Sequence, residues 1–94
     1  MLDYTNGDAI RFLVNFKDEN GVLFDPSSTW GRIYDSSSVV VSSVSALTRV
    51  ETGVYRHDWQ TDPSTIGLGV GAFEAYGLSG TLTYRRREKL FQLV

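Results

Sequence analysis

The sequence predicts a small all-β domain, a β-sandwich of about seven antiparallel strands that occupies residues 1–94 as a single domain. Apolar and polar residues alternate with a period of two in several short segments. Glycines, Asp-Pro pairs and serine clusters interrupt the chain at spacings of about ten residues. No segment sustains the spacing of an amphipathic helix over three turns. Together these observations favour a sandwich or a barrel.

The clearest alternation runs from Ala9 to Lys17. Its expected inward row consists of Ile10, Phe12, Val14 and Phe16. The Asp18–Gly21 segment predicts a tight hairpin turn, because Asn-Gly readily adopts positive φ angles. Val22–Phe24 is then expected to return as a short strand, ended by Asp25-Pro26. This part of the chain therefore predicts a β-hairpin at the start of the domain.

The later strands are expected at 29–35, 39–43, 45–50, 54–59, 69–76 and 81–94. Strand alternation assigns each residue of these segments to one of two faces. In the 29–35 segment, the inward row is Thr29, Gly31 and Ile33, and the outward row is Trp30, Arg32 and Tyr34. In the 54–59 segment, one row is Tyr55, His57 and Trp59, and the other is Val54, Arg56 and Asp58.

Composition excludes several classes of protein. The chain has no cysteine, which rules out disulfides, thiolate metal sites and cysteine nucleophiles. Neither a signal peptide nor an apolar run long enough to cross a bilayer is present, so we expect synthesis in the cytoplasm and no membrane contact. The net charge of −2 is unevenly distributed, because basic residues are in excess after Asp62 and acidic residues before it. Such a dipolar chain suits ordered packing against neighbours.

Five segments carry a resemblance to a known family. They are Tyr4–Asp8, Phe16–Gly21, Asp25–Ser28, Ile33–Asp35 and Thr52–Trp59. The chain resembles the small immunoglobulin-like domains related to bacterial Ig-like and macroglobulin-type modules, whose stand-alone versions are common among tailed-phage structural genes. The resemblance implies an immunoglobulin-like sandwich and a virion protein of the capsid surface, neck or tail. Its motifs are turn and core residues, so they report the fold more than the function.

The chain departs from this family pattern at two places. Gly69-Val70-Gly71 stands where such domains often have Gly-x-Tyr or Gly-x-Trp, and Gly31 stands where a larger β-branched residue is usual. Both departures thin the core locally. The core keeps its density there only if neighbouring aromatic side chains, such as Phe73 and Tyr55, fill the space.

The sequence contains the residue types of a catalytic triad, namely His57, Asp58 and many serines. Adjacent residues of a strand point to opposite faces, so Asp58 is not expected to orient the His57 ring. We expect His57 to pack at the edge of the core instead. The single histidine also lacks cysteine partners for a zinc site. The sequence therefore predicts no enzymatic activity.

An acidic loop could be read as a calcium site. Its oxygen ligands would come from Asp18, Glu19, Asn20 and Asp25. The same residues are explained by a hairpin turn, in which Asp and Asn bond to their own backbone, and their spacing matches no known calcium loop. We therefore predict no metal and no cofactor.

The Arg85–Lys89 segment contains four of the nine basic residues. A negative net charge and the lack of a recognition motif argue against nucleic-acid binding. Strict alternation would place Arg85 and Arg87 on the same face as Phe91, in the core, at prohibitive cost. Either the strand bulges near Lys89 or its first half extends into solvent. The second option is preferred, which makes residues 77–87 a projecting basic hairpin.

Two features remain for function, and their residues are the candidate partner-binding set. The set is Trp30, Arg32, Tyr34, Arg85, Arg86 and Arg87. Trp, Tyr and Arg are the residues most enriched at interface hot spots, although the outward row of 29–35 could equally be a cross-strand aromatic pair covered by a neighbour. The expected function is that of a non-enzymatic virion component bound to other structural subunits, with copies of itself among them. The alternative is an adhesion or recognition module that binds carbohydrate or a host surface.

Overall fold

The computed structural model describes residues 2–62, 64 and 66–94, and for residues 2 and 87–90 it describes the backbone. Within these residues the secondary structure consists of strands, and no helix able to span a membrane is found among them. The strands are β1 (Leu2–Tyr4), β2 (Ala9–Asn15), β3 (Ser28–Tyr34), β4 (Val40–Val44), β5 (Thr48–Glu51), β6 (Val54–Gln60), β7 (Gly69–Ser79) and β8 (Leu82–Leu93). The predicted all-β class is confirmed.

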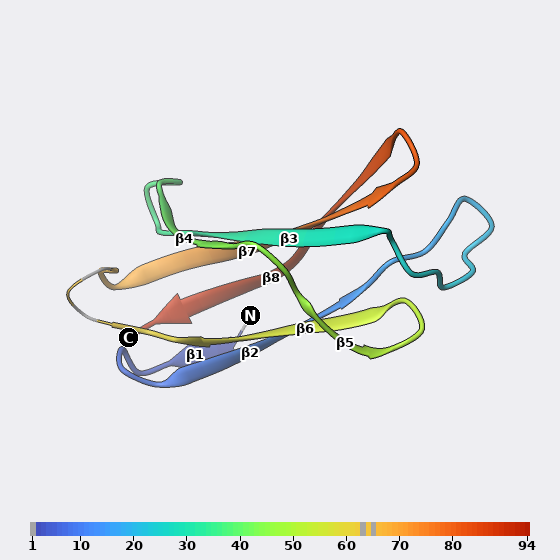
Figure 1. The fold of residues 1–94 in the computed structure, drawn as a ribbon. Coiled ribbons are helices and arrows are strands. Elements are labelled where there is room, and N and C mark those ends of the chain that lie inside the picture. The colour runs from blue at the N-terminus through green and yellow to red at the C-terminus, as the bar shows by residue number, and fades with distance from the viewer. Residues whose placement is uncertain (1, 63, 65) are drawn as a thin grey trace.

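The strands form two open sheets that face each other (Figure 1). One sheet has five strands in the order β1-β8-β7-β3-β4, and the other has three in the order β2-β6-β5. The expectation that every pair is antiparallel is wrong for one pair, because β1 runs parallel to β8. The eighth strand is β1 itself, which the sequence analysis did not predict. Its three residues are too few to show a periodicity.

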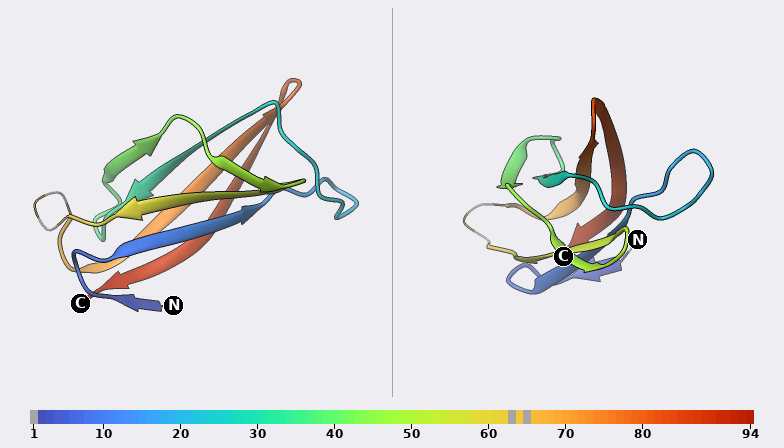
Figure 2. Two further views of the ribbon diagram at one scale, coloured as in Figure 1. Left: turned by 60° about the horizontal axis from the view of Figure 1, so that its bottom comes forward. Right: turned by 45° about the vertical axis from the view of Figure 1, so that its right-hand side comes forward.

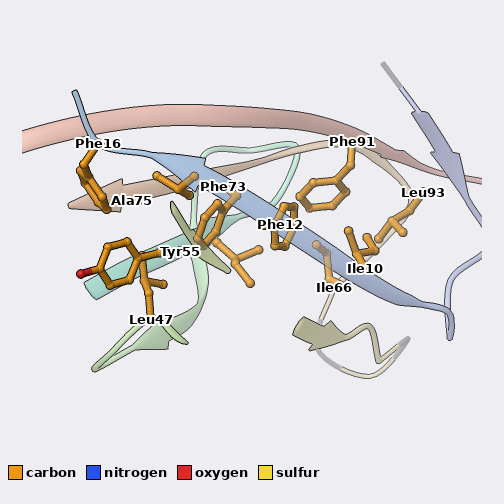
Figure 3. Packing of buried hydrophobic residues seen from close by; sticks show 12 residues of the cluster. Ile10, Phe12, Phe16, Leu47, Tyr55, Ile66, Phe73, Ala75, Phe91 and Leu93 are labelled. Atoms are coloured by element: carbon orange, nitrogen blue, oxygen red, sulfur yellow. The ribbon is translucent and has the colours of Figure 1, made fainter. Parts of the chain in front are cut away.

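The core lies between the two sheets and is built around three phenylalanine rings (Figure 3). Phe12 of β2 stacks on Phe73 of β7 with ring centroids 4.4 Å apart, and Phe91 of β8 lies 5.7 Å from Phe12. The predicted inward row of the first strand is confirmed, since each of Ile10, Phe12, Val14 and Phe16 is at most 1% exposed. These contacts pack the two sheets against each other.

The glycine at position 31 leaves room for one of these rings. A Cβ atom at Gly31 would lie 3.0 Å from Cε1 of Phe73 and 3.2 Å from the backbone oxygen of Glu74. Phe73 thus fills the space that the missing side chain leaves. Close packing of this kind makes the core sensitive to the addition of even one methyl group.

The segment between β2 and β3 is a turn and a loop instead of the expected hairpin. Asp18 accepts hydrogen bonds from the backbone N–H groups of Asn20 and Val22, at 2.9 and 3.0 Å, and Gly21 has a φ of 77°. The predicted turn is therefore present. The return strand is reduced to a single bridge between Lys17 and Leu23.

Asp25 anchors the end of this loop to the turn between β5 and β6. Its carboxylate accepts hydrogen bonds from the N–H of Gly53 at 2.9 Å and from the hydroxyl of Tyr55 at 3.2 Å, and it pairs with Arg49 at 3.2 Å. These donors, the Gly53 N–H first, lower the pKa of Asp25. The carboxylate that sequence analysis considered for calcium is thus engaged by other residues of the chain.

A β-bulge in β8 explains how the basic segment avoids the core, although strict alternation would place Arg85 and Arg87 there. Phe73 is opposite Lys89, whereas the next residue of β7, Glu74, is opposite Arg87, so Glu88 is the extra residue. The bulge reverses the alternation, which places Phe91 in the core and Arg85 on the outer face of the sheet. The structure therefore adopts the bulge, whereas the sequence analysis preferred a strand that extends into solvent.

Candidate functional site

The outer face of the five-stranded sheet brings together side chains from three adjacent strands. Register places Trp30 of β3 opposite Tyr76 of β7, which is opposite Arg85 of β8. Arg32 and Tyr34 continue the same row of β3. We call this set the aromatic–arginine face, and it comprises Trp30, Arg32, Tyr34, Tyr76 and Arg85.

Tyr76 is the centre of this face. The indole of Trp30 stacks on its ring, with centroids 5.5 Å apart and an interplanar angle of 6°. The guanidinium carbon of Arg32 lies 5.6 Å from the same ring, at the distance of a cation–π contact. The predicted outward orientation of Trp30, Arg32 and Tyr34 is confirmed, since Arg32 is exposed and both aromatic residues are half-buried. The cross-strand aromatic pair that sequence analysis left open is present as well.

The environment of Tyr76 keeps its hydroxyl protonated. Partial burial first, then a side-chain hydrogen bond with Tyr34 and the negative charge of Glu74, raise the pKa of Tyr76. Arg32 acts in the opposite direction and does not reverse the effect. The face therefore presents the neutral phenol of Tyr76 beside the guanidinium group of Arg32.

Glu74 lies beneath this face and holds Arg85 in place. Its side chain is 7% exposed, although it points to the outer side of the sheet, and its Oε2 atom lies 3.2 Å from Nε of Arg85. A nearly buried carboxylate requires a positive partner, and Arg85 supplies one across the β7–β8 pair. Arg85 itself remains 69% exposed and can reach a partner molecule while paired.

The structure separates the three arginines of the basic segment. Arg85 belongs to the aromatic–arginine face, whereas Arg86 points to the other side of β8, where it donates a hydrogen bond to the carbonyl of Lys17 at 3.1 Å. The side chain of Arg87 lies outside the described residues. The prediction of a projecting basic arm is wrong. The β7–β8 hairpin does extend past the other strands (Figure 1), but its tip residues, Ser79–Leu82, are uncharged and Arg85 and Arg86 are bonded to the body.

Sequence analysis missed two members of the site, Tyr76 and Glu74. It placed the strand over 69–76 but did not sort its residues by face. The small and aromatic residues Gly71, Phe73 and Ala75 all face inward. Because residues of a strand alternate between its two faces, Glu74 and Tyr76 could have been assigned to the outer face. This is the face on which the predicted outward row of β3 lies.

The other candidates have structural explanations. His57 lies against Phe73 with ring centroids 6.3 Å apart, and burial is the main reason that its pKa is lowered. Asp58 points to the opposite face, as predicted, and pairs with Arg11 at 2.7 Å. Among the described residues, no three metal-ligating side chains converge.

Comparisons with known proteins add no assignment. No family model, no curated protein and no solved structure matches this chain. The case for function therefore rests on the geometry of the aromatic–arginine face and on the sequence resemblance described above.

Proposed function

We propose that the fold is immunoglobulin-like. In variable-type immunoglobulin sandwiches, strands B, E and D share one sheet while strands G, F, C and C′ share the other. The order β2-β6-β5 corresponds to B-E-D, and the order β8-β7-β3-β4 corresponds to G-F-C-C′. This correspondence of both sheets is the support for the assignment.

The domain is, in this proposal, a non-enzymatic binding module that attaches to neighbouring protein subunits through the aromatic–arginine face. The observation that carries the proposal is the stacked pair of Trp30 and Tyr76 beside two exposed cations, Arg32 and Arg85, on an open sheet face. Trp, Tyr and Arg are the residues most enriched at the hot spots of protein interfaces.

The expected partner surface is acidic. Arg32 and Arg85 leave this face with an excess of positive charge over Glu74, while the chain as a whole carries −2. Complementary potentials set orientation and speed of association. Acidic residues before Asp62 outnumber basic ones, so one copy can present acidic loops to the basic face of the next. Such packing suits an assembly of many copies.

The assembly we propose is the virion of a tailed phage, at the capsid surface, neck or tail. Support comes from the sequence resemblance and from the absence of an acid–base or nucleophile–base pair among the described residues of this face. The alternative is an adhesion module for carbohydrate or a host surface, which would bind its ligand through the same flat aromatic stack.

Two measurements test the proposal. Mass spectrometry of gradient-purified virions is expected to detect this chain in a fixed ratio to the major structural subunits. A photo-crosslinking amino acid at position 32 is then expected to join it to one of those subunits, whereas the same group at Arg56, on the other sheet, is not. A chain that is absent from particles but binds a glycan array through the same face would instead establish the adhesion alternative.

A further inference from the structure

Four strands lie at the ends of the two sheets, and β2 differs from the other three. β1 has three residues, and the pairings of β4 and β5 are interrupted by register shifts. β2 has seven residues, contains no proline and pairs with β6 without any shift. Proteins commonly shorten, bulge or charge their edge strands because a long regular edge is a template for another strand. β2 carries one charged residue, Arg11, but it is the edge strand that is neither short nor bulged.

The register identifies the backbone groups on this edge. Thr61 donates its N–H to the carbonyl of Asp8 at 3.1 Å, and Phe16 donates its N–H to the carbonyl of Gly53 at 2.8 Å. These two bonds bracket the β2–β6 ladder, so every second residue between them directs its N–H and C=O groups to β6. The intervening residues direct theirs away from the sheet. They are Ala9, Arg11, Leu13 and Asn15.

No described residue supplies hydrogen-bond partners to the backbone groups of these four residues. Their side chains are exposed as well, with Leu13 47% exposed. A hollow of about 390 Å³ lies at the start of the same strand, lined by Ala9, Ile10, Arg11 and Asp58. Unpaired backbone groups and an exposed leucine therefore coincide on one edge, and the hollow lies beside the first residues of the same strand.

We propose that this edge binds an extended segment of another polypeptide, which adds to β2 as an antiparallel fourth strand of the smaller sheet. Donors and acceptors that alternate at strand spacing are the groups that an extended peptide matches when it adds to a sheet edge. An aliphatic residue of the segment covers Leu13, and an acidic residue adds to the existing pair of Arg11 with Asp58, since the Arg11 side chain is 60% exposed. The site is separate from the aromatic–arginine face.

A lone segment fits this edge better than a second folded copy. β1 pairs with β8 instead of β2, and it runs on the same side of the molecule as the free edge (Figure 2, left). A second sandwich docked through its own β2 would bring a second β1 to the same place. An extended segment brings no second sheet with it.

The test uses a synthetic peptide of about nine residues, long enough to span β2, which alternates valine and threonine and carries one aspartate placed to face Arg11. Backbone NMR of the labelled protein is the readout. We expect titration to shift the amides of Arg11, Leu13 and Asn15 and to slow their hydrogen exchange at least tenfold. The amides of Phe12 and Val14, already bonded to β6, should change little.

Two controls isolate the backbone contacts. A peptide N-methylated at alternate residues loses its donors and should bind at least tenfold more weakly. In the protein, Leu13→Pro removes one outward N–H without touching the β2–β6 bonds, whereas Leu13→Thr retains the N–H and removes only the aliphatic side-chain contact. The proline variant should therefore bind much more weakly than the threonine variant. The N-methylated peptide keeps the test decisive if Leu13→Pro fails to fold.

Three results would overturn the proposal. One is a peptide that leaves these amides unshifted at millimolar concentration. Another is protection that appears on β4 or β5 instead. The third is self-association of the chain alone, seen by sedimentation, that protects the same three amides, since the occupant would then be a second copy. None of these outcomes affects the proposed function of the aromatic–arginine face.

Discussion

The two faces of the five-stranded sheet are built from alternate residues of the same strands, yet they use aromatic side chains in different ways. On the inner face, Phe73 is fully buried and fills the space above Gly31. On the outer face, Trp30 and Tyr76 stack in the open and are only half-buried. Burial stabilises the fold through the inner rings, whereas the outer rings retain contact area for another molecule. The comparison separates residues that fold the domain from residues that are available for binding.

The largest effect is expected on the inner face. Phe73→Ala removes the ring that contacts both Phe12 and the backbone near Gly31, and it leaves a cavity between the sheets. We expect the free energy of unfolding to fall by about 3–5 kcal/mol, measured by urea denaturation. A loss below 1 kcal/mol, similar to that of an outer residue, would remove the distinction between the faces.

A smaller effect on stability is expected for Trp30→Ala. The variant loses one stacking contact with Tyr76, which is worth about 1 kcal/mol beyond the area that it buries. Binding to the partner subunit should fall far more, because truncating an interface tryptophan commonly costs at least about 2 kcal/mol. Denaturation and a pull-down with purified particles measure the two quantities side by side. A stability loss comparable to that of Phe73→Ala would assign Trp30 to the fold.

Arg85→Ala probes the ion pair under the outer face. Arg85 is 69% exposed, so solvent screening reduces the contribution of its pair with Glu74 to about 0.5–1 kcal/mol. We expect the loss of stability to shrink further as salt is raised from 0.05 to about 0.5 M. A salt-independent loss of several kcal/mol would show that Arg85 alone compensates the negative charge of the nearly buried Glu74 carboxylate.

The smallest effect is expected from the pH dependence of His57, which lies against the inner face. Burial lowers its pKa below the ordinary value of 6.5, so the folded state binds fewer protons than the unfolded chain. Stability should therefore decline as the pH falls from about 6.5, and His57→Gln should abolish this part of the decline. Below about 4, the lowered pKa values of Asp25 and Asp58 add a second decline in both proteins. A wild-type curve that is flat between pH 6.5 and 5 contradicts the burial of the imidazole.

Periodicity alone predicted the strands that form the core, because one buried face imposes a strict alternation of residues. The inward row from Ile10 to Phe16 and the outward row of Trp30, Arg32 and Tyr34 are examples. β1 could not be predicted in this way, since a three-residue strand has no periodicity and its parallel partner is at the other end of the chain. The sequence analysis considered a bulge in β8 as one of two options. Which option the chain adopts depends on the backbone register of β7 and β8, which sets Glu74 opposite Arg87.

The site was only partly predictable for a related reason. Trp30 and Arg32 were found by their alternation on one strand, but Tyr76 joins them through antiparallel register between β3 and β7. Register is set by tertiary pairing and leaves no local signal in the sequence. The same limitation concealed Glu74, whose nearly buried carboxylate pairs with Arg85.

Competition between wild-type protein and Arg32→Ala for incorporation into virions tests the role of the aromatic–arginine face most directly. Arg32 is exposed and its contact with the Tyr76 ring is weak, so the variant should keep the wild-type melting temperature. Arg56→Ala, on the opposite sheet, is the matched control. We predict that particles assembled from equal mixtures contain at least tenfold less Arg32→Ala than wild type and equal amounts of Arg56→Ala. Equal incorporation of all three proteins would contradict a binding role for this face.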